Sequence, residues 1–140
     1  MRRIFVDSGA FVAIGDRNDA HHRAAIDWLR SYSGRFITSS DVLDESATRL
    51  RYDGGLASAE RFRELIEAME QRQRLEIVWT SRELHQNAWD VLARYPDVTL
   101  SFTDALSIAI AEARGCDAMF AFDRDFLAVG VPMVPQIERR

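Results

Sequence analysis

Four acidic side chains stand where they could act together on a metal ion or a water molecule: Asp7, Glu45, Asp104 and Asp123. Each is expected at the carboxyl end of a strand, or on a helix that could reach that edge of a sheet, where open α/β sheets bind their ligands. Carboxylates that converge repel one another unless cations neutralise them. An oxygen-only ligand set favours Mg²⁺ or Mn²⁺ over zinc. We therefore expect a Mg²⁺ site, with Mn²⁺ as the alternative.

Each acid also has a purely structural explanation. Asp104 follows Ser101 by three residues, the spacing of a capping box that satisfies helix N–H groups. Asp123 could cap a short helix at 124–127, and Glu45 could compensate a helix dipole. Asp7 is the hardest to explain in this way, because an acid directly after a buried strand gains nothing from an exposed helix face. The shared edge of the sheet favours a functional site.

The hydrophobic pattern predicts the elements that position these acids. Short apolar segments, typical of buried strands, occur at 2–6, 35–38, 75–79, 118–122 and 131–134. Segments with helical spacing lie between them, at 9–15, 20–33, 41–52, 56–74, 81–94 and 103–114. Strands that are apolar throughout and alternate with helices indicate a parallel sheet covered on both faces. The predicted fold class is α/β, a three-layer α/β/α domain with a central, mostly parallel sheet.

Length and composition exclude several classes of protein. A chain of 140 residues builds one hydrophobic core, so we expect a single domain over 1–140. All 18 basic residues are arginine, and without lysine neither a P-loop nor a pyridoxal phosphate enzyme is possible. The single cysteine excludes an intrachain disulfide. No apolar stretch approaches the about 20 residues that span a bilayer. We expect a soluble, cytoplasmic protein with no membrane partner.

The net charge of −4 does not exclude a nucleic-acid substrate. A pair of Mg²⁺ ions would neutralise the four candidate acids, and the formal charge would then move to about zero. The negative net charge of the chain is therefore explained in part by the acids of the expected metal site.

Four segments, in this order, resemble the motifs of PIN-domain proteins: Ile4–Ala13, Val42–Leu50, Leu100–Ala109 and Ala121–Phe126. The first combines a hydrophobic strand with an Asp and a Ser, and the second has an E-x-x-T arrangement. Serine stands in the first motif where threonine is common, and alanine replaces a frequent threonine before the fourth acid. The resemblance covers nearly the whole chain. Its size and order are most similar to VapC-type toxins of bacterial toxin–antitoxin pairs.

This resemblance implies a Mg²⁺-dependent endoribonuclease that hydrolyses RNA phosphodiester bonds, as the toxin of a type II toxin–antitoxin pair. It implies that Asp7, Asp104 and Asp123 are metal ligands. Glu45 is then a further ligand or orients the attacking water. The hydroxyls expected to hold the carboxylates in orientation are those of Ser8, Thr48 and Ser101. The resemblance also implies a VapB-like antitoxin that obstructs the acidic site, and a homodimer.

Two other functions are considered. A receiver-like signalling domain also gathers acids at strand ends, but it uses a lysine that this chain lacks. A catalytically silent PIN-like module would hold RNA or protein without cleaving it. Such a module has no need to retain four like charges, so the enzyme is favoured. Asp125 is either an auxiliary acid or a solvent-facing residue.

Other chemically distinctive residues receive no role in the predicted site. The histidines lack the spacing of a zinc site and are expected to be solvated: His21, His22 and His85. The tryptophans lie in apolar patterns and are expected in the core: Trp28, Trp79 and Trp89. Several arginines near the motifs either contact phosphates or form a solvated helix face: Arg49, Arg51, Arg61, Arg63 and Arg124. None is assigned to the substrate.

Overall fold

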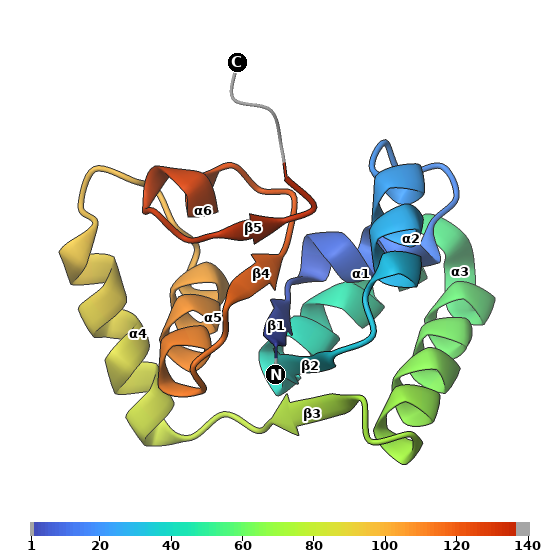
Figure 1. Ribbon diagram of the computed structural model, residues 1–140, viewed down its shortest axis with the longest axis horizontal. Coiled ribbons are helices and arrows are strands. Elements are labelled where there is room, and N and C mark those ends of the chain that lie inside the picture. The colour runs from blue at the N-terminus through green and yellow to red at the C-terminus, as the bar shows by residue number, and fades with distance from the viewer. Residues whose placement is uncertain (1, 137–140) are drawn as a thin grey trace.

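The computed structural model describes residues 2–136, in which strands and helices alternate (Figure 1). The strands are β1 (Arg3–Val6), β2 (Arg35–Ser39), β3 (Leu75–Val78), β4 (Ala118–Phe120) and β5 (Met133–Val134). The helices are α1 (Ser8–Gly15), α2 (His22–Ser31), α3 (Ser40–Gln71), α4 (Arg82–Arg94), α5 (Phe102–Ala113) and α6 (Asp125–Ala128). Over the described residues, no helix combines the length and the apolar character needed to cross a membrane.

The five strands form one sheet in the order β3-β2-β1-β4-β5, and every neighbouring pair is parallel. Figure 1 shows α1, α2 and α3 on one face of the sheet and α4 and α5 on the other. The predicted three-layer α/β/α architecture is therefore confirmed. Because all strands run in the same direction, their carboxyl ends meet at one edge of the sheet.

The middle strand β1 is fixed at its carboxyl end by contacts from both of its neighbours. The backbone N–H of Asp7 donates to the carbonyl of Phe120 at 3.0 Å, on the β4 side. On the β2 side, the hydroxyl of Thr38 donates to the carbonyl of Val6 at 2.9 Å. The backbone position of the first acid is thus set by two strands distant in sequence.

Aromatic side chains fill the space between the sheet and the first helices. Phe11 of α1 meets Phe62 of α3 edge to face, with ring centroids 5.3 Å apart, which joins α1 to the second half of α3. Trp28 of α2 packs over the sheet against Phe36 and Phe120. Such aromatic pairs stabilise a core by about 0.5–1.5 kcal/mol beyond the area that they bury. Trp28 is half-buried and packs against the core, in partial agreement with the prediction.

The prediction is wrong for the other two tryptophans. Trp79 is 73% exposed, because it follows the last paired residue of β3, and β3 is an edge strand. Trp89 is 63% exposed on the solvent side of α4, where its ring meets that of Phe102. In both cases the local apolar pattern extends beyond the part of the element that the fold buries.

Several predicted boundaries shift by one or two residues, as for the helix predicted at 20–33, which spans His22–Ser31. The helices predicted at 41–52 and 56–74 are joined in α3, where the helical geometry is interrupted at Gly55 (φ 78°, ψ −178°). The strand predicted over 118–122 ends at Phe120, the last residue of β4 that pairs with β1 or with β5. Asp123 therefore lies three residues beyond the end of β4 rather than directly after the strand.

The interruption of α3 yields a test of the backbone. Gly55 combines positive φ with extended ψ, a region that costs a residue with a side chain about 1–3 kcal/mol. An added Cβ would meet nothing within 4 Å, so the cost is backbone strain. We expect Gly55→Ala to lower the free energy of unfolding by that amount in urea denaturation. Gly9→Ala, at an unstrained helical position in α1, should be neutral or stabilising. Equal losses in both variants would contradict the strained conformation.

Candidate active site

A pocket of about 460 Å³ opens at the carboxyl edge of the sheet, and all four candidate acids line it. Asp7 follows β1, Glu45 lies on α3, Asp104 lies on α5, and Asp123 lies between β4 and α6. The structure thus brings together four carboxylates from four separate segments of the chain.

Asp7 is the most constrained of the four. Its residue is only 5% exposed, and its Oδ1 atom has no hydrogen-bond partner among the described residues. Burial above all, together with the nearby charges of Asp104 and Glu45, raises the pKa of its carboxyl group to about 7. The backbone N–H groups of Ser8 and Gly9 oppose this effect by lowering the pKa. A buried carboxylate oxygen without a hydrogen-bond partner is stabilised by a bound proton or by a nearby cation.

Glu45 is exposed on α3, and one hydroxyl directs it. Ser8, the first residue of α1, donates its hydroxyl to Glu45 Oε1 at 2.6 Å. Because Ser8 is buried and adjacent to Asp7, this hydrogen bond ties the carboxylate of α3 to the end of β1. The serine that stands where threonine is common therefore retains the hydroxyl contact.

Asp104 caps the start of α5 and also lines the pocket. The Ser101 hydroxyl accepts the backbone N–H of Asp104 at 3.0 Å, and Asp104 Oδ2 accepts the backbone N–H of Ser101 at 3.3 Å. This is the capping box considered from the sequence, and the same carboxylate also lines the pocket. Burial raises its pKa, as do the charges of Asp123 and Glu45, whereas the hydrogen bonds with Ser101 lower it. Structural and functional explanations of Asp104 are therefore compatible.

Asp123 is exposed, and its Oδ1 accepts the backbone N–H of Asp125 at 2.9 Å at the start of α6. This local hydrogen bond fixes the turn that carries Asp123 back to the pocket. Asp125 itself does not line the pocket, and neither does Thr48, which is exposed on α3. Of the three predicted supporting hydroxyls, the structure thus places Ser8 and Ser101 at the acids and Thr48 outside the pocket.

Four further residues lie at the rim of the pocket, and none of them was assigned to the site from the sequence: Asp19, His21, Arg49 and Phe122. His21 lies flat on Phe122, with ring centroids 4.4 Å apart and planes 7° apart. His21 was expected to be merely solvated, and no local pattern indicates its contact with a residue from the far end of the chain. Arg49, for which a phosphate contact and a solvated helix face were both left open, lies four residues after Glu45 and thus on the same helix face.

The donor set fits a hydrated divalent cation. Within residues 2–136, no three Asp, Glu, His or Cys side chains form a ready-made metal cluster as they stand. Hydrogen bonds hold Glu45, Asp104 and Asp123, whereas Oδ1 of Asp7 is left without one. Mg²⁺ usually keeps several waters and takes only one or two carboxylates directly. Among the described residues, Oδ1 of Asp7 is therefore free to contact such an ion.

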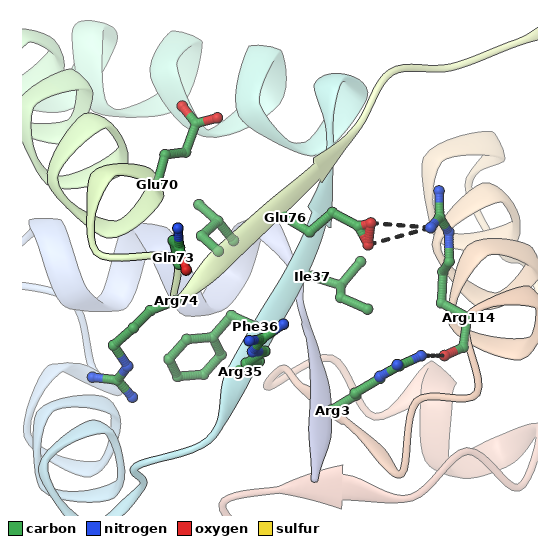
Figure 2. Close-up of a pocket in the computed structure, with 10 residues that line it drawn as sticks. Arg3, Arg35, Phe36, Ile37, Glu70, Gln73, Arg74, Glu76 and Arg114 are labelled. Atoms are coloured by element: carbon green, nitrogen blue, oxygen red, sulfur yellow. Dashed lines mark hydrogen bonds and ion pairs between the residues drawn. The ribbon is translucent and has the colours of Figure 1, made fainter. Parts of the chain in front are cut away.

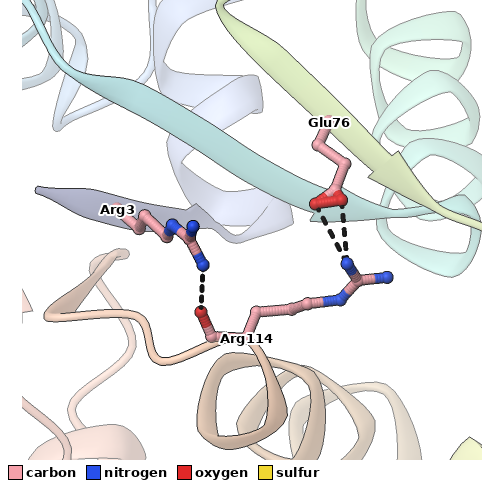
Figure 3. A network of polar contacts seen from close by, with 3 residues as sticks. All are labelled: Arg3, Glu76 and Arg114. Carbon is pink, nitrogen blue, oxygen red and sulfur yellow. Dashed lines mark hydrogen bonds and ion pairs between the residues drawn. The ribbon is translucent and has the colours of Figure 1, made fainter. Parts of the chain in front are cut away.

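A second cavity, of about 570 Å³, lies at the amino ends of the strands (Figure 2). Its lining is rich in arginine, with Arg3, Arg35, Arg74 and Arg114 beside two glutamates. Arg114 pairs with Glu76, with 3.0 Å between Nη1 and Oε2, and its carbonyl accepts a hydrogen bond from Arg3 (Figure 3). Arg74 donates to the carbonyls of Tyr32 and Gly34 in the loop before β2. The cavity contains no cluster of acids or nucleophiles, so the acidic pocket is the candidate active site.

Comparison with known proteins gives consistent matches. The profile of the PIN domain matches residues 4–132. The 23S rRNA-specific endonuclease VapC20 of Mycobacterium tuberculosis is 32% identical over 127 residues, which cover 91% of this chain and 94% of the relative. The crystal structure of M. tuberculosis VapC20, described as a sarcin–ricin loop cleaving toxin, superposes with a TM-score of 0.81 at 30% identity, covering 91% of this chain and 95% of that one. VapBC2 from Rickettsia felis shares the fold, with a TM-score of 0.68 at 13% identity and coverage of 94% and 96%.

The burial of Asp7 predicts how stability depends on pH without divalent cations. The unfolded chain ionises this group near pH 3.9, whereas the folded protein holds the proton up to about pH 7. Between these values the folded state binds more protons, so this contribution to stability is lost as pH rises from about 4 through 7. Asp7→Asn removes the contribution. In urea denaturation with EDTA, the variant should gain on the order of 2–4 kcal/mol relative to the wild type between pH 4 and pH 8.

Asp44→Asn is the matched control, because Asp44 is an exposed acid of α3 that does not line the pocket. It should follow the wild-type profile. If the difference between Asp7→Asn and the wild type stayed constant from pH 4 to pH 8, Asp7 would not be the buried acid described here.

Proposed function

The chain belongs to the PIN-domain family, and from this premise we propose that it is a metal-dependent endoribonuclease that hydrolyses RNA phosphodiester bonds, using Mg²⁺ or Mn²⁺. One observation carries the proposal: the buried Asp7, with an unpartnered oxygen, shares a pocket with three further carboxylates. A purely structural acid would be paired by the fold, because an unpaired buried carboxylate is costly. The relative named as a 23S rRNA-specific endonuclease makes ribosomal RNA the first substrate to test.

The roles follow from how each side chain is held. Asp7, Asp104 and Asp123 are the proposed ligands, directly or through water. Glu45, oriented by the Ser8 hydroxyl, either completes the ligand set or accepts a hydrogen bond from the attacking water. Ser101 fixes the rotation of the Asp104 carboxylate. A divalent cation bound here would lower the pKa of a water molecule and neutralise charge on the phosphorane-like transition state.

The biological setting proposed is the toxin of a type II toxin–antitoxin pair, acting in the cytoplasm, where ribosomal RNA is found. The order of the four acidic motifs supports this setting, as does the relative whose structure is described as that of a toxin. The cognate antitoxin would be VapB-like and would obstruct the acidic pocket with a basic side chain. The chain would act as one domain and assemble as a homodimer.

Substitution of the proposed ligands tests the activity directly. Asp7→Asn and Asp104→Asn should each reduce Mg²⁺-dependent cleavage of ribosomal RNA to background, because each removes a charge that holds the cation. Cleavage is followed on denaturing gels, with EDTA as the metal-free reference. Unchanged circular dichroism would show that the variants are folded, and Asp44→Asn should cleave like the wild type. Robust cleavage by either pocket variant would refute the assignment.

A calorimetric titration separates the enzyme from the silent binding module. The wild type should bind Mn²⁺ or Mg²⁺, and Asp7→Asn should bind it at least about 10-fold more weakly, since the remaining acids are engaged in hydrogen bonds. If the wild type binds neither ion, the silent module is the better account.

Light scattering tests the assembly. At micromolar concentration the purified chain should show twice the mass of one 140-residue chain. A species of single-chain mass under the same conditions would contradict the homodimer without affecting the proposed chemistry.

A further inference from the structure

The rim of the acidic pocket carries an aromatic stack that the proposed chemistry does not use. His21, in the loop before α2, lies on Phe122 with ring planes 7° apart. Both rings line the pocket together with the four acids. Metal binding and water activation need carboxylates, so neither ring is explained by that reaction.

Of the two stacked rings, Phe122 is packed against the core and His21 is exposed. Phe122 is half-buried and packs edge to face on Phe120, which is fully buried in β4. His21 is exposed, and its backbone N–H donates to the side chain of Asp19 at 2.8 Å, which holds the loop in place. A ring held on one face and exposed to the pocket is preorganised for another flat group.

An arginine side chain also lies at the rim of the pocket. Arg49 lies one helical turn after Glu45 on α3, lines the same pocket and is exposed. Within the described part of the chain, the ion pairs are made by Arg63, Arg94 and Arg114, so the guanidinium of Arg49 is not committed to a carboxylate there. Arginine presents a planar fork of donors that matches the oxygens of a phosphate.

We propose that the rim is a nucleotide-binding subsite, in which a nucleobase stacks on the His21–Phe122 pair and Arg49 holds a neighbouring phosphate. The ligand class is an unpaired RNA nucleotide next to the scissile bond, because proteins read RNA by stacking splayed bases on aromatic rings. This inference rests on the proposed RNA cleavage. The rim would bind the substrate, whereas the acids would carry out the hydrolysis.

The test compares two side chains at position 21 and two forms of the substrate. The bond that the wild type cleaves is first mapped on ribosomal RNA, and a short oligonucleotide spanning it is made with and without a base at each flanking nucleotide. His21→Ala should raise KM by about 5- to 150-fold, the range expected from stacking one base. His21→Phe, which keeps a flat ring, should stay within about 3-fold of the wild type.

The substrate supplies the decisive comparison. Removing the stacked base from the substrate should raise the KM of the wild type as much as the His21→Ala substitution does. It should not raise the KM of the His21→Ala variant any further. Arg49→Ala should also raise KM, whereas Arg51→Ala, on the same helix but outside the pocket, should not. All variants should bind Mn²⁺ as the wild type does, since the acids are untouched.

The outcomes separate this inference from the proposed function. If the wild type cleaves RNA but His21→Ala keeps the wild-type KM, or if base removal affects both proteins equally, the subsite is wrong and the nuclease stands. If the wild type cleaves no RNA, the proposed function fails and the subsite fails with it. A loss of Mn²⁺ binding in His21→Ala would also overturn the subsite, because His21 would then support the metal site instead.

Discussion

The arrangement of this protein depends on the burial of one carboxylate at the end of the middle strand. Asp7 is anchored by its backbone to β4, and burial raises the pKa of its side chain to about 7. The other acids approach it from three separate elements, each held by a hydrogen bond from Ser8, Ser101 or the α6 turn. A group of like charges that the fold itself assembles is stable only with protons or cations between them. The fold thus prepares the site at a cost in stability that a bound ion would offset.

The two edges of the sheet carry opposite charge. Acids gather at the carboxyl ends of the strands, whereas arginines gather at the amino ends (Figure 2). There Arg74 donates to the carbonyls of Tyr32 and Gly34 at 3.1 Å each, a role that suits a guanidinium with five donors. In a chain without lysine, arginine both fixes loops at one edge and, at Arg49, supplies positive charge beside the acids.

The acids could be predicted because each lies close to a short apolar segment or a helix start, and parallel strands bring those ends together. Contacts between distant segments could not be predicted. Nothing near His21 indicates that its ring lies on Phe122, and Thr48 matches a motif but lies outside the pocket. Trp79 was predicted in the core but is exposed, because the local apolar pattern continues past the last paired residue of an edge strand. Local patterns fix elements, whereas the packing of those elements decides which side chains meet.

The most direct measurement of the central claim is the titration of the Asp7 carboxyl carbon by NMR, with and without Mg²⁺. Without the ion, the resonance should titrate with a pKa near 7, well above an ordinary aspartate. With saturating Mg²⁺, it should remain in the ionised form across pH 5–8, because the cation replaces the proton. A resonance that titrates near pH 4 and does not respond to Mg²⁺ would contradict the account.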